Sequence, residues 1–454
     1  MTPTASSTAP SRSRHVPWPS HPLTAPAAQV RPERLLARAE TVVPRSALPA
    51  RAARAAVTAL LRRLDTGQLT IVAPDGSRAV YRGRTDGDDA EVHVLDDRAW
   101  TAVATEGSIG LGRGYIEGWW TTPDPVGLLQ LLTRNLRTLD ELRNRWQHAT
   151  GGMTDRLRRV LPGPGRSANR EDIASHYDLG NDFFSLFLDE TMTYSAGVFA
   201  HRGADMATAS RAKYDRLLAK LGVHAGTSLL EVGTGWGGLA LRAAGSLGCP
   251  VTTTTISAEQ RAEARRRVEA AGLTDRITVL DKDWRDLQGR FDRVVSIEMI
   301  EAVDWRHYDR FFATLDRLVA PDGLVGLQAI CVPDRRYERA KKTEDFIRRF
   351  VFPGGNLPSI GSITRAVAHS TRLQILDVED FSAHYAETLA RWRTEFDAKI
   401  DEVRALGLDD RFCRLWRFYL AYCEAGFRER HCTVNQIILA GPRWRPDGLS
   451  LRPH

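Results

Sequence analysis

An acidic residue followed by three glycines marks the most informative stretch of this 454-residue chain. An apolar run ends at Glu231, and Gly233, Gly235 and Gly237 then alternate with other residues before a helix-forming segment at 239–244. This order predicts a buried parallel strand, a tight turn and a helix N-terminus, where glycines let the backbone approach a flat ligand. The spacing differs from the G-x-G-x-x-G of dehydrogenases and is typical of loops that bind S-adenosylmethionine; an ordinary strand-to-helix turn is the alternative.

Polar loops follow the next two predicted strands. In nucleotide-binding α/β folds, an acidic residue at the end of the second strand usually binds the ribose. Here Ile256, rather than an acid, follows the strand at 251–255, so the side chains of Thr255 and Gln260 must make that contact. After the strand at 277–280, Asp283 can bond an adenine amine and Trp284 can cover the ring. Three such loops in this order favour a methyl-donor site over unrelated polar loops.

Two carboxylates stand three residues apart where the fourth strand ends. Glu298 and Glu301 follow an apolar run at 293–297, so both can face one cleft. One of them can instead cap the helix that follows.

The spacing of apolar runs predicts an α/β fold. Strand candidates at 228–232, 251–255, 277–280, 293–297 and 324–328 alternate with helical stretches such as 258–271 and 308–318. Alternation of this kind predicts a parallel sheet with right-handed crossovers and ligands at its carboxyl ends. From Tyr337 onward the chain is predicted to be helical and aromatic.

Composition and turn signals divide the chain into segments. Strands at 69–73, 79–81 and 90–94, with helices at 34–65 and 125–136, predict a small α+β domain. The N-terminal segment is rich in Pro, Ala, Ser and Thr, which predicts a disordered tail; the alternative interpretation is a membrane-tethering arm. The predicted segments are a disordered tail at 1–33, an N-terminal domain at 34–150, a linker at 151–169, the main domain at 170–440 and a C-terminal tail at 441–454.

Charge and cysteine content limit the partners and the compartment. The net charge of +7 favours binding to an anionic partner, either nucleic acid or an anionic lipid leaflet. The alternative is an arginine-rich surface that only contacts solvent. No nucleic-acid motif is present, so nucleic acid is not expected. Five cysteines without C-x-x-C spacing argue against a disulfide framework and a zinc site and favour a reducing cytoplasm. No apolar run reaches the roughly 20 residues of a membrane span.

Six motifs carry a resemblance to a known family. They are SHYDLGNDFFSLFLDETMTYSAGV (175–198), LLEVGTGWGGLA, TTISAEQ, SIEMIEAV, FVFPGGNLPSI and YLAYCEAGF, in that order. Together they make the chain similar to the cyclopropane-fatty-acyl-phospholipid synthase family, over residues 100–440. IGLGRGYIEGWW at 109–120 also resembles that family's N-terminal lipid-binding domain. The resemblance implies a class I methyltransferase Rossmann-like sheet with helical lipid-pocket additions.

The resemblance also implies a reaction, in which S-adenosylmethionine methylates the cis double bond of an unsaturated, phospholipid-bound acyl chain. It assigns donor contacts to Tyr194, Ser195, Gly233, Gly235, Thr255, Ile256, Gln260 and Trp284. It assigns Glu301, Ile330 and Tyr385 to a bicarbonate ion, and an active-site role to Cys423.

Three replacements put the bicarbonate in doubt. The family's Tyr-Ser-Cys is here Tyr-Ser-Ala, ending at Ala196, and its Glu-His is Glu301-Ala302. The histidine that helps to hold bicarbonate is Gln328. These replacements resemble a subgroup with actinobacterial enzymes of the tuberculostearic type and plant-type cyclopropane synthases, so a cyclopropane and a methylene or methyl branch both stay open.

Methyl transfer to a double bond needs a base and an active site that excludes water and stabilises a cation. Methylation of a double bond leaves a carbocation, which water would trap and which aromatic faces stabilise. We expect Glu301 to bind or be the base that removes a proton, with Gln328 beside it. Tyr177, Phe183, Phe184, Tyr385 and Trp392 are the aromatic candidates.

Two other functions stay open. A methyltransferase for a soluble small molecule would share the glycine loop, and a non-catalytic lipid carrier would share only the N-terminal domain. The expected partners are acyl chains and an anionic membrane surface, with peripheral binding at the inner leaflet, and a homodimer is possible.

Overall fold

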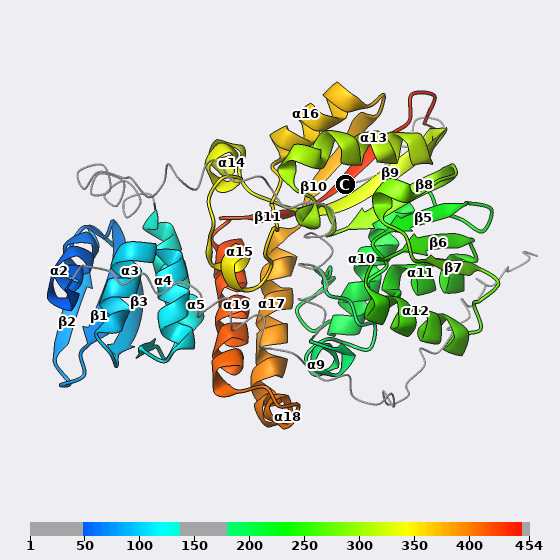
Figure 1. Cartoon of the computed structure of the whole chain (residues 1–454). Coiled ribbons are helices and arrows are strands. Elements are labelled where there is room, and N and C mark those ends of the chain that lie inside the picture. The colour runs from blue at the N-terminus through cyan, green and yellow to red at the C-terminus, as the bar shows by residue number, and fades with distance from the viewer. Residues whose placement is uncertain (1–48, 137–178, 447–454) are drawn as a thin grey trace, which may run out of the picture.

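The computed structural model of the chain describes residues 49–136 and 179–446. These residues form two sheets, each with its own helices (Figure 1). The predicted tail at 1–33, the linker at 151–169 and Tyr177 lie outside the described residues, as does most of the C-terminal tail.

A seven-stranded sheet forms the larger part of the molecule. Its order is β10-β11-β9-β8-β5-β6-β7. All five predicted strands are present and run parallel to one another. Their bounds are β5 Leu229–Val232, β6 Val251–Thr254, β7 Ile277–Leu280, β8 Phe291–Ile297 and β9 Val319–Cys331.

Helices bury both faces of this sheet. Leu229 and Val295 pack with one set of helices, whereas Leu230 and Val294 pack with the other, because side chains alternate along a strand. The first set is α10 (Met206–Lys220), α11 (Gly238–Arg242) and α12 (Ala258–Ala270). The second is α13 (Tyr308–Leu318) and α16 (Ile360–Ser370). This two-sided burial explains why the strands are continuous apolar runs.

The prediction that the chain is wholly helical after Tyr337 is wrong. Two strands, β10 (Gln374–Asp380) and β11 (Thr433–Ala440), extend the sheet beyond β9 in antiparallel pairings. Helices do lie between them and before them: α14 (Asp334–Ala340), α15 (Phe346–Phe350), α17 (Ser382–Ala398), α18 (Ile400–Ala405) and α19 (Asp410–Arg428).

In the N-terminal part, residues 49–136 form a four-stranded sheet of order β2-β1-β3-β4 with four helices. The predicted hairpin is present as an antiparallel β1–β2 pair, and β3 joins β1 in parallel. The bounds are α2 Ala50–Leu61, β1 Thr66–Val72, β2 Arg78–Arg82, β3 Thr85–Val94, α3 Arg98–Glu106, α4 Ser108–Ile116, β4 Trp120–Thr121 and α5 Pro125–Arg134.

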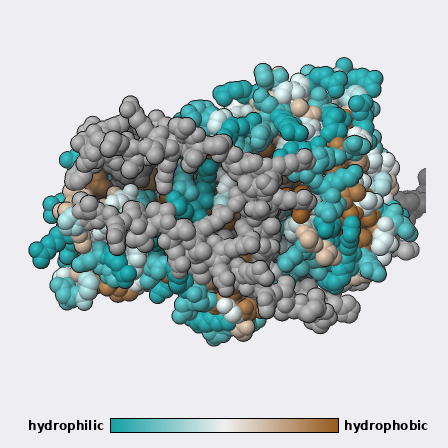
Figure 2. Space-filling view, in the orientation of Figure 1, coloured by the Kyte–Doolittle hydropathy of each residue, from teal (hydrophilic) through white to brown (hydrophobic). Residues whose placement is uncertain are grey.

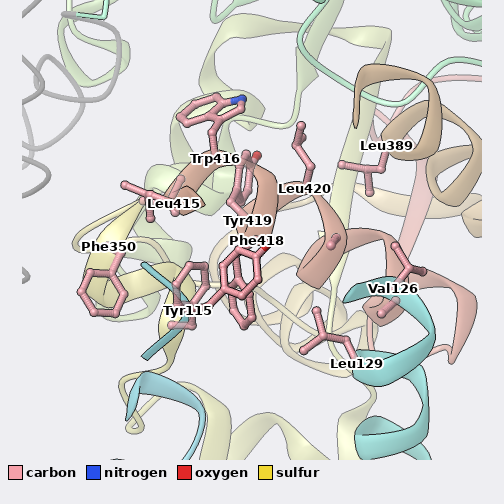
Figure 3. Close-up of a cluster of buried hydrophobic side chains, with 14 of the residues drawn as sticks. Tyr115, Val126, Leu129, Phe350, Leu389, Leu415, Trp416, Phe418, Tyr419 and Leu420 are labelled. Carbon is pink, nitrogen blue, oxygen red and sulfur yellow. The ribbon is translucent and has the colours of Figure 1, made fainter. Parts of the chain in front are cut away.

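An aromatic core joins the N-terminal part to α19. Tyr115 of α4 lies 5.3 Å, ring centre to ring centre, from Phe418 of α19, and Val126 and Leu129 of α5 belong to the same cluster (Figure 3). On its other side the cluster includes the short helix α9 (Asn181–Ser185) and α17. The N-terminal part is therefore packed on the helices that, as described below, also wall the cavity.

The coloured surface in Figure 2 is mostly hydrophilic, with small hydrophobic patches. Within the described parts of the chain, no helix is both long and apolar enough to cross a bilayer.

Candidate active site

A cavity of about 430 Å³ lies at the carboxyl ends of the parallel strands. Most of the predicted site residues line it: Tyr194, Ser195, Glu231, Gly233, Gly235, Thr255, Ile256, Gln260, Asp283, Trp284, Glu301, Ile330, Tyr385 and Cys423. Gly237 and Gln328 do not line it. Gly237 is the N-cap of α11, and Gln328 lies behind Glu298.

The glycine loop leaves space for a ligand at the end of β5. Gly235 has φ +50°, and a Cβ built there would meet no atom within 4 Å. Gly233 has φ +103°, which also favours glycine. The loop thus presents bare backbone to the cavity, as a donor-binding loop requires.

Glu231 lies beneath this loop and is held by a pair of threonines. Its Oε2 accepts a hydrogen bond of 2.7 Å from Thr253 Oγ1, and Thr253 Oγ1 lies 2.7 Å from Thr234 Oγ1. Burial raises the pKa of Glu231 to about 8, which favours the protonated form of its carboxyl group.

The loops after β6 and β7 form the adjoining wall. Ser257 caps α12 and accepts a hydrogen bond from the backbone of Gln260, whose Oε1 lies 3.1 Å from Thr255 Oγ1. Asp283 pairs with Arg285 at 2.6 Å beside Trp284. The three predicted loops therefore meet at one end of the cavity, in the arrangement expected for a nucleoside.

Glu298 is the carboxylate on which donors converge. Its Oε1 accepts hydrogen bonds from the backbone N–H of Ala196 (3.0 Å) and from Gln328 Nε2 (2.7 Å), while its Oε2 accepts from Tyr385 Oη (2.7 Å). Gln436 of the neighbouring strand in turn lies 3.3 Å from Gln328 Oε1. Burial raises the pKa of Glu298, and Lys213 and these donors oppose that rise.

Glu298 also has φ +47°, an uncommon backbone conformation for a side chain other than glycine. The residue directly follows β8, and its backbone N–H donates to Gln328 O at 2.8 Å. The left-handed turn thus places the carboxylate at the end of the strand, within the cavity wall.

Glu301 has fewer partners. Its Oε1 accepts a 2.6 Å hydrogen bond from the backbone N–H of Ile330, whereas its Oε2 has no partner among the described residues. Burial, with Glu298 second, raises the pKa of Glu301 to about 8. The sequence predicts that Gln328 lies beside Glu301, but Tyr385 and Gln328 both donate to Glu298.

A buried lysine was missed by the sequence analysis. Lys213 of α10 is fully buried and donates a 2.6 Å hydrogen bond to Ser195 Oγ. The signal was present, because Ala209, Ser210, Tyr214 and Leu217 place residue 213 on the buried stripe of its helix. A lysine on such a stripe is rare unless it has a specific partner.

Cys423 lines the cavity, and none of the described residues lowers the pKa of its thiol. Burial raises the pKa of its thiol well above the ordinary value, and Cys432 and Asp345 add to the effect. A thiol in this state is not a nucleophile, because the reactive form is the thiolate. Its position makes it part of the apolar wall.

The aromatic candidates divide into two groups. Tyr385 lines the cavity and stacks on Phe427, with ring centres 4.4 Å apart. Phe183, Phe184 and Trp392 are buried in the aromatic core and do not line the cavity. Further rings on the wall are those of Tyr194, Tyr214, Trp236, Phe352, Tyr419 and Tyr422.

Comparison with known proteins identifies the family. The family model described as mycolic acid cyclopropane synthetase matches residues 165–437, more than half of the chain. The chain belongs to this family. It is 41% identical over 410 residues, 88% of this chain and 94% of the relative, to the tuberculostearic acid methyltransferase UfaA1 of Mycobacterium tuberculosis. It is 35% identical to the cyclopropane-fatty-acyl-phospholipid synthase of Escherichia coli K12, over 77% of this chain and 88% of that one.

A solved structure extends the likeness to three dimensions. The mycolic acid cyclopropane synthase CmaA1, crystallised with SAH and CTAB, superposes with a TM-score of 0.56 at 32% identity, covering 62% of this chain and 99% of that one. These findings confirm the predicted family, the class I methyltransferase fold and the enzyme class, an S-adenosylmethionine-dependent methyltransferase of unsaturated acyl chains. They do not favour the alternative of a soluble small-molecule substrate.

Proposed function

We propose that this enzyme methylates the cis double bond of a phospholipid-bound acyl chain, and that Glu298 takes the proton whose loss forms the product. The observation that carries the proposal is the convergence of Ala196 N–H, Gln328 and Tyr385 on the Glu298 carboxylate in the cavity wall. A carboxylate that accepts three hydrogen bonds is held in one position, which a general base requires.

The donor site fits S-adenosylmethionine. The open backbone at Gly235, the polar side chains of Thr255 and Gln260, and Trp284 are the residues that would hold it. When bound, it supplies an electrophilic methyl group. The protein's part is to align the acyl double bond with that group and to keep water away from the resulting cation.

The proton balance of the reaction is simple. The π electrons of the double bond form the new carbon–methyl bond while the methyl–sulfur bond breaks and its electron pair stays on sulfur, which leaves a positive charge on the second alkene carbon. For a cyclopropane, an oxygen of Glu298 takes a proton from the transferred methyl group, and the electron pair of that C–H bond closes the ring. For a methylene branch, a hydride first shifts from the methylated carbon to the cationic carbon; Glu298 then takes a proton from the methyl group, and that electron pair forms the double bond of the branch. The aromatic wall beside Tyr385 stabilises the positive charge until the proton has left.

A bicarbonate ion does not fit this site as an additional base. The polar donors at Tyr385, Gln328 and Ala196 are already bonded to the side chain of Glu298. An added anion would place a second negative charge beside that carboxylate without replacing those donors. We therefore derive no step through bicarbonate.

For the product, we propose a mid-chain methylene branch. The similarity to the tuberculostearic acid methyltransferase covers 88% of this chain, against 77% for the cyclopropane synthase of Escherichia coli. A methylene branch, unlike a saturated methyl branch, requires no reductant.

The test is to incubate the protein with labelled donor and oleoyl-phospholipid vesicles and to analyse the acyl chains. The ring and methylene products are isomers, so mass alone does not separate them. Ozonolysis converts a methylene branch to a ketone and leaves a cyclopropane intact. Label that enters the lipid and is released as formaldehyde when the ketone forms supports the proposal, because the transferred carbon is the methylene carbon. A labelled chain that ozone leaves intact contradicts the methylene product, and an unlabelled lipid contradicts the substrate.

We further propose peripheral binding to an anionic membrane through the segment at α14 and α15. Arg336 and Arg348 line the cavity, and Arg335 and Lys342 in the same stretch are exposed. The net charge of +7 suits such a surface. Each basic residue near an anionic leaflet contributes about 1 kcal/mol.

A double charge reversal tests this surface. Arg335→Glu with Lys342→Glu should weaken sedimentation with anionic vesicles at least about tenfold, because two attractive contacts become repulsive. The matched control is Arg276→Glu with Arg290→Glu, since both residues are exposed and precede β7 and β8 at the opposite end of the sheet. Equal loss in both double variants would contradict a specific surface.

A further inference from the structure

Lys213 has surroundings that are unusual for a lysine. Its side chain is 0% exposed, and no ion pair to it is found in the described parts of the chain. Its contacts are the 2.6 Å hydrogen bond to Ser195 Oγ and the ring of Tyr214, whose centre lies 4.2 Å from Nζ. Burying an ammonium group is costly, so an apolar side chain on this stripe would serve packing better.

Three acids from different elements act on this ammonium group. They are Glu298 after β8, Asp189 in the segment after α9, and Glu231 at the end of β5, with Glu298 contributing most. Glu298 is the acid with three hydrogen-bond donors, so it is best able to carry the negative charge. Glu231 and Glu301 each have one donor in the structure, and burial raises the pKa of each to about 8, which favours their protonated forms.

We propose that Lys213 is a positioning residue for methyl transfer, whose ammonium group keeps Glu298 ionised and fixes the segment that carries Ser195 and Ala196. This inference rests on the proposed function of Glu298 as the base. Lys213 contacts neither substrate nor donor, because it does not line the cavity.

The hydrogen bond to Ser195 explains how Lys213 fixes the segment that carries Ser195 and Ala196. An ammonium group can only donate, so Ser195 Oγ accepts and its own hydrogen is free to point elsewhere. Ser195 lines the cavity, and the next residue, Ala196, donates its backbone N–H to Glu298. Lys213 thus holds the Ser195 hydroxyl, a proposed contact of S-adenosylmethionine, and the adjacent backbone N–H of Ala196, which is one of the three hydrogen-bond donors to Glu298.

The pH dependence of turnover tests the proposal. The acidic limb of the wild-type profile should report ionisation of Glu298. Burial lowers the pKa of Lys213 to about 8, so an alkaline limb near that pH should report loss of the ammonium charge. A wild-type profile that stays flat from pH 7 to 10 would overturn the inference without any variant.

Two variants separate charge from packing. Lys213→Met keeps the length of the side chain but removes the charge, so it should move the acidic limb up by at least about one pH unit and lower turnover at pH 7 about tenfold or more. Lys213→Arg keeps the charge at every accessible pH, so the alkaline limb should disappear while the acidic limb stays. Thermal unfolding confirms that each variant is folded.

The outcomes distinguish this inference from the proposed function. An unchanged acidic limb in folded Lys213→Met overturns the role of Lys213, even if Glu298→Gln is inactive. An acidic limb that survives in Glu298→Gln overturns the proposed base itself.

Discussion

Replacing Glu298 by glutamine removes the proposed base with the smallest possible change of shape. The amide oxygen can accept the hydrogen bonds that Oε1 now accepts from Ala196 N–H and Gln328, and the amide nitrogen can donate to Tyr385 Oη. The loss of hydrogen bonding should therefore cost no more than about 1 kcal/mol of the free energy of unfolding, while Lys213, which loses its main opposing charge, should release its proton more easily. The amide cannot take a proton, so turnover should fall by about 10² to 10⁴, which corresponds to roughly 3–5 kcal/mol in the barrier.

The assay is transfer of labelled methyl to oleoyl-phospholipid vesicles under single-turnover conditions, with donor affinity measured by calorimetry. Donor affinity should stay near that of the wild type, because the base acts after binding. The matched control is Glu301→Gln, the same substitution three residues away in the same cavity wall. Glu301 has one hydrogen-bond donor and burial raises its pKa to about 8, so its carboxyl group is more protonated at pH 7 than an ordinary glutamate, and its replacement should cost less than about tenfold. A severe loss in Glu301→Gln together with a mild loss in Glu298→Gln would refute the reasoning.

Three further substitutions test other parts of the account. Gly235→Val should weaken donor binding severely while the protein still folds, since the side chain enters open space in the cavity at a left-handed φ; unchanged affinity by calorimetry would contradict this. Gly112→Ala should lower the thermal midpoint although alanine favours helices, because a Cβ there lies 2.2 Å from the ring of buried Phe346; a raised midpoint would show that the contact relaxes. For Glu231, the folded pKa of about 8 exceeds the ordinary 4.5, so its contribution to stability is complete below pH 4.5 and is lost as the pH rises through 8. Glu231→Gln should therefore flatten the fall in thermal midpoint between pH 5 and about 8.5, and a variant that falls as steeply as the wild type would contradict the assignment.

The sequence was sufficient to predict the central sheet but not its edge. The five parallel strands are apolar runs covered on both faces, a pattern that is visible without a structure. Strand β10 is mostly exposed and polar, and β11 carries two buried polar residues, Asn435 and Gln436. Neither strand is therefore the continuous apolar run that identifies a buried strand from sequence. Both are strands because they pair with β9 and with each other, which is a tertiary effect.

The donor loops were also predictable, because each follows a recognisable strand. The partners of Glu298 were not, since Ala196, Gln328 and Tyr385 lie 102, 30 and 87 residues away along the chain. Its left-handed backbone has no sequence signature either. The choice between the two glutamates therefore required the three-dimensional arrangement of their hydrogen-bond donors.

Dependence of turnover on bicarbonate tests the central claim most directly, namely that a side chain of this protein supplies the base. In bicarbonate-free buffer, wild-type turnover should equal that measured with added bicarbonate, because Glu298 already uses the donors at Tyr385, Gln328 and Ala196. Glu298→Gly frees those donors, so its residual activity should rise when bicarbonate is added. Loss of wild-type activity without bicarbonate, restored by its addition, would contradict the account.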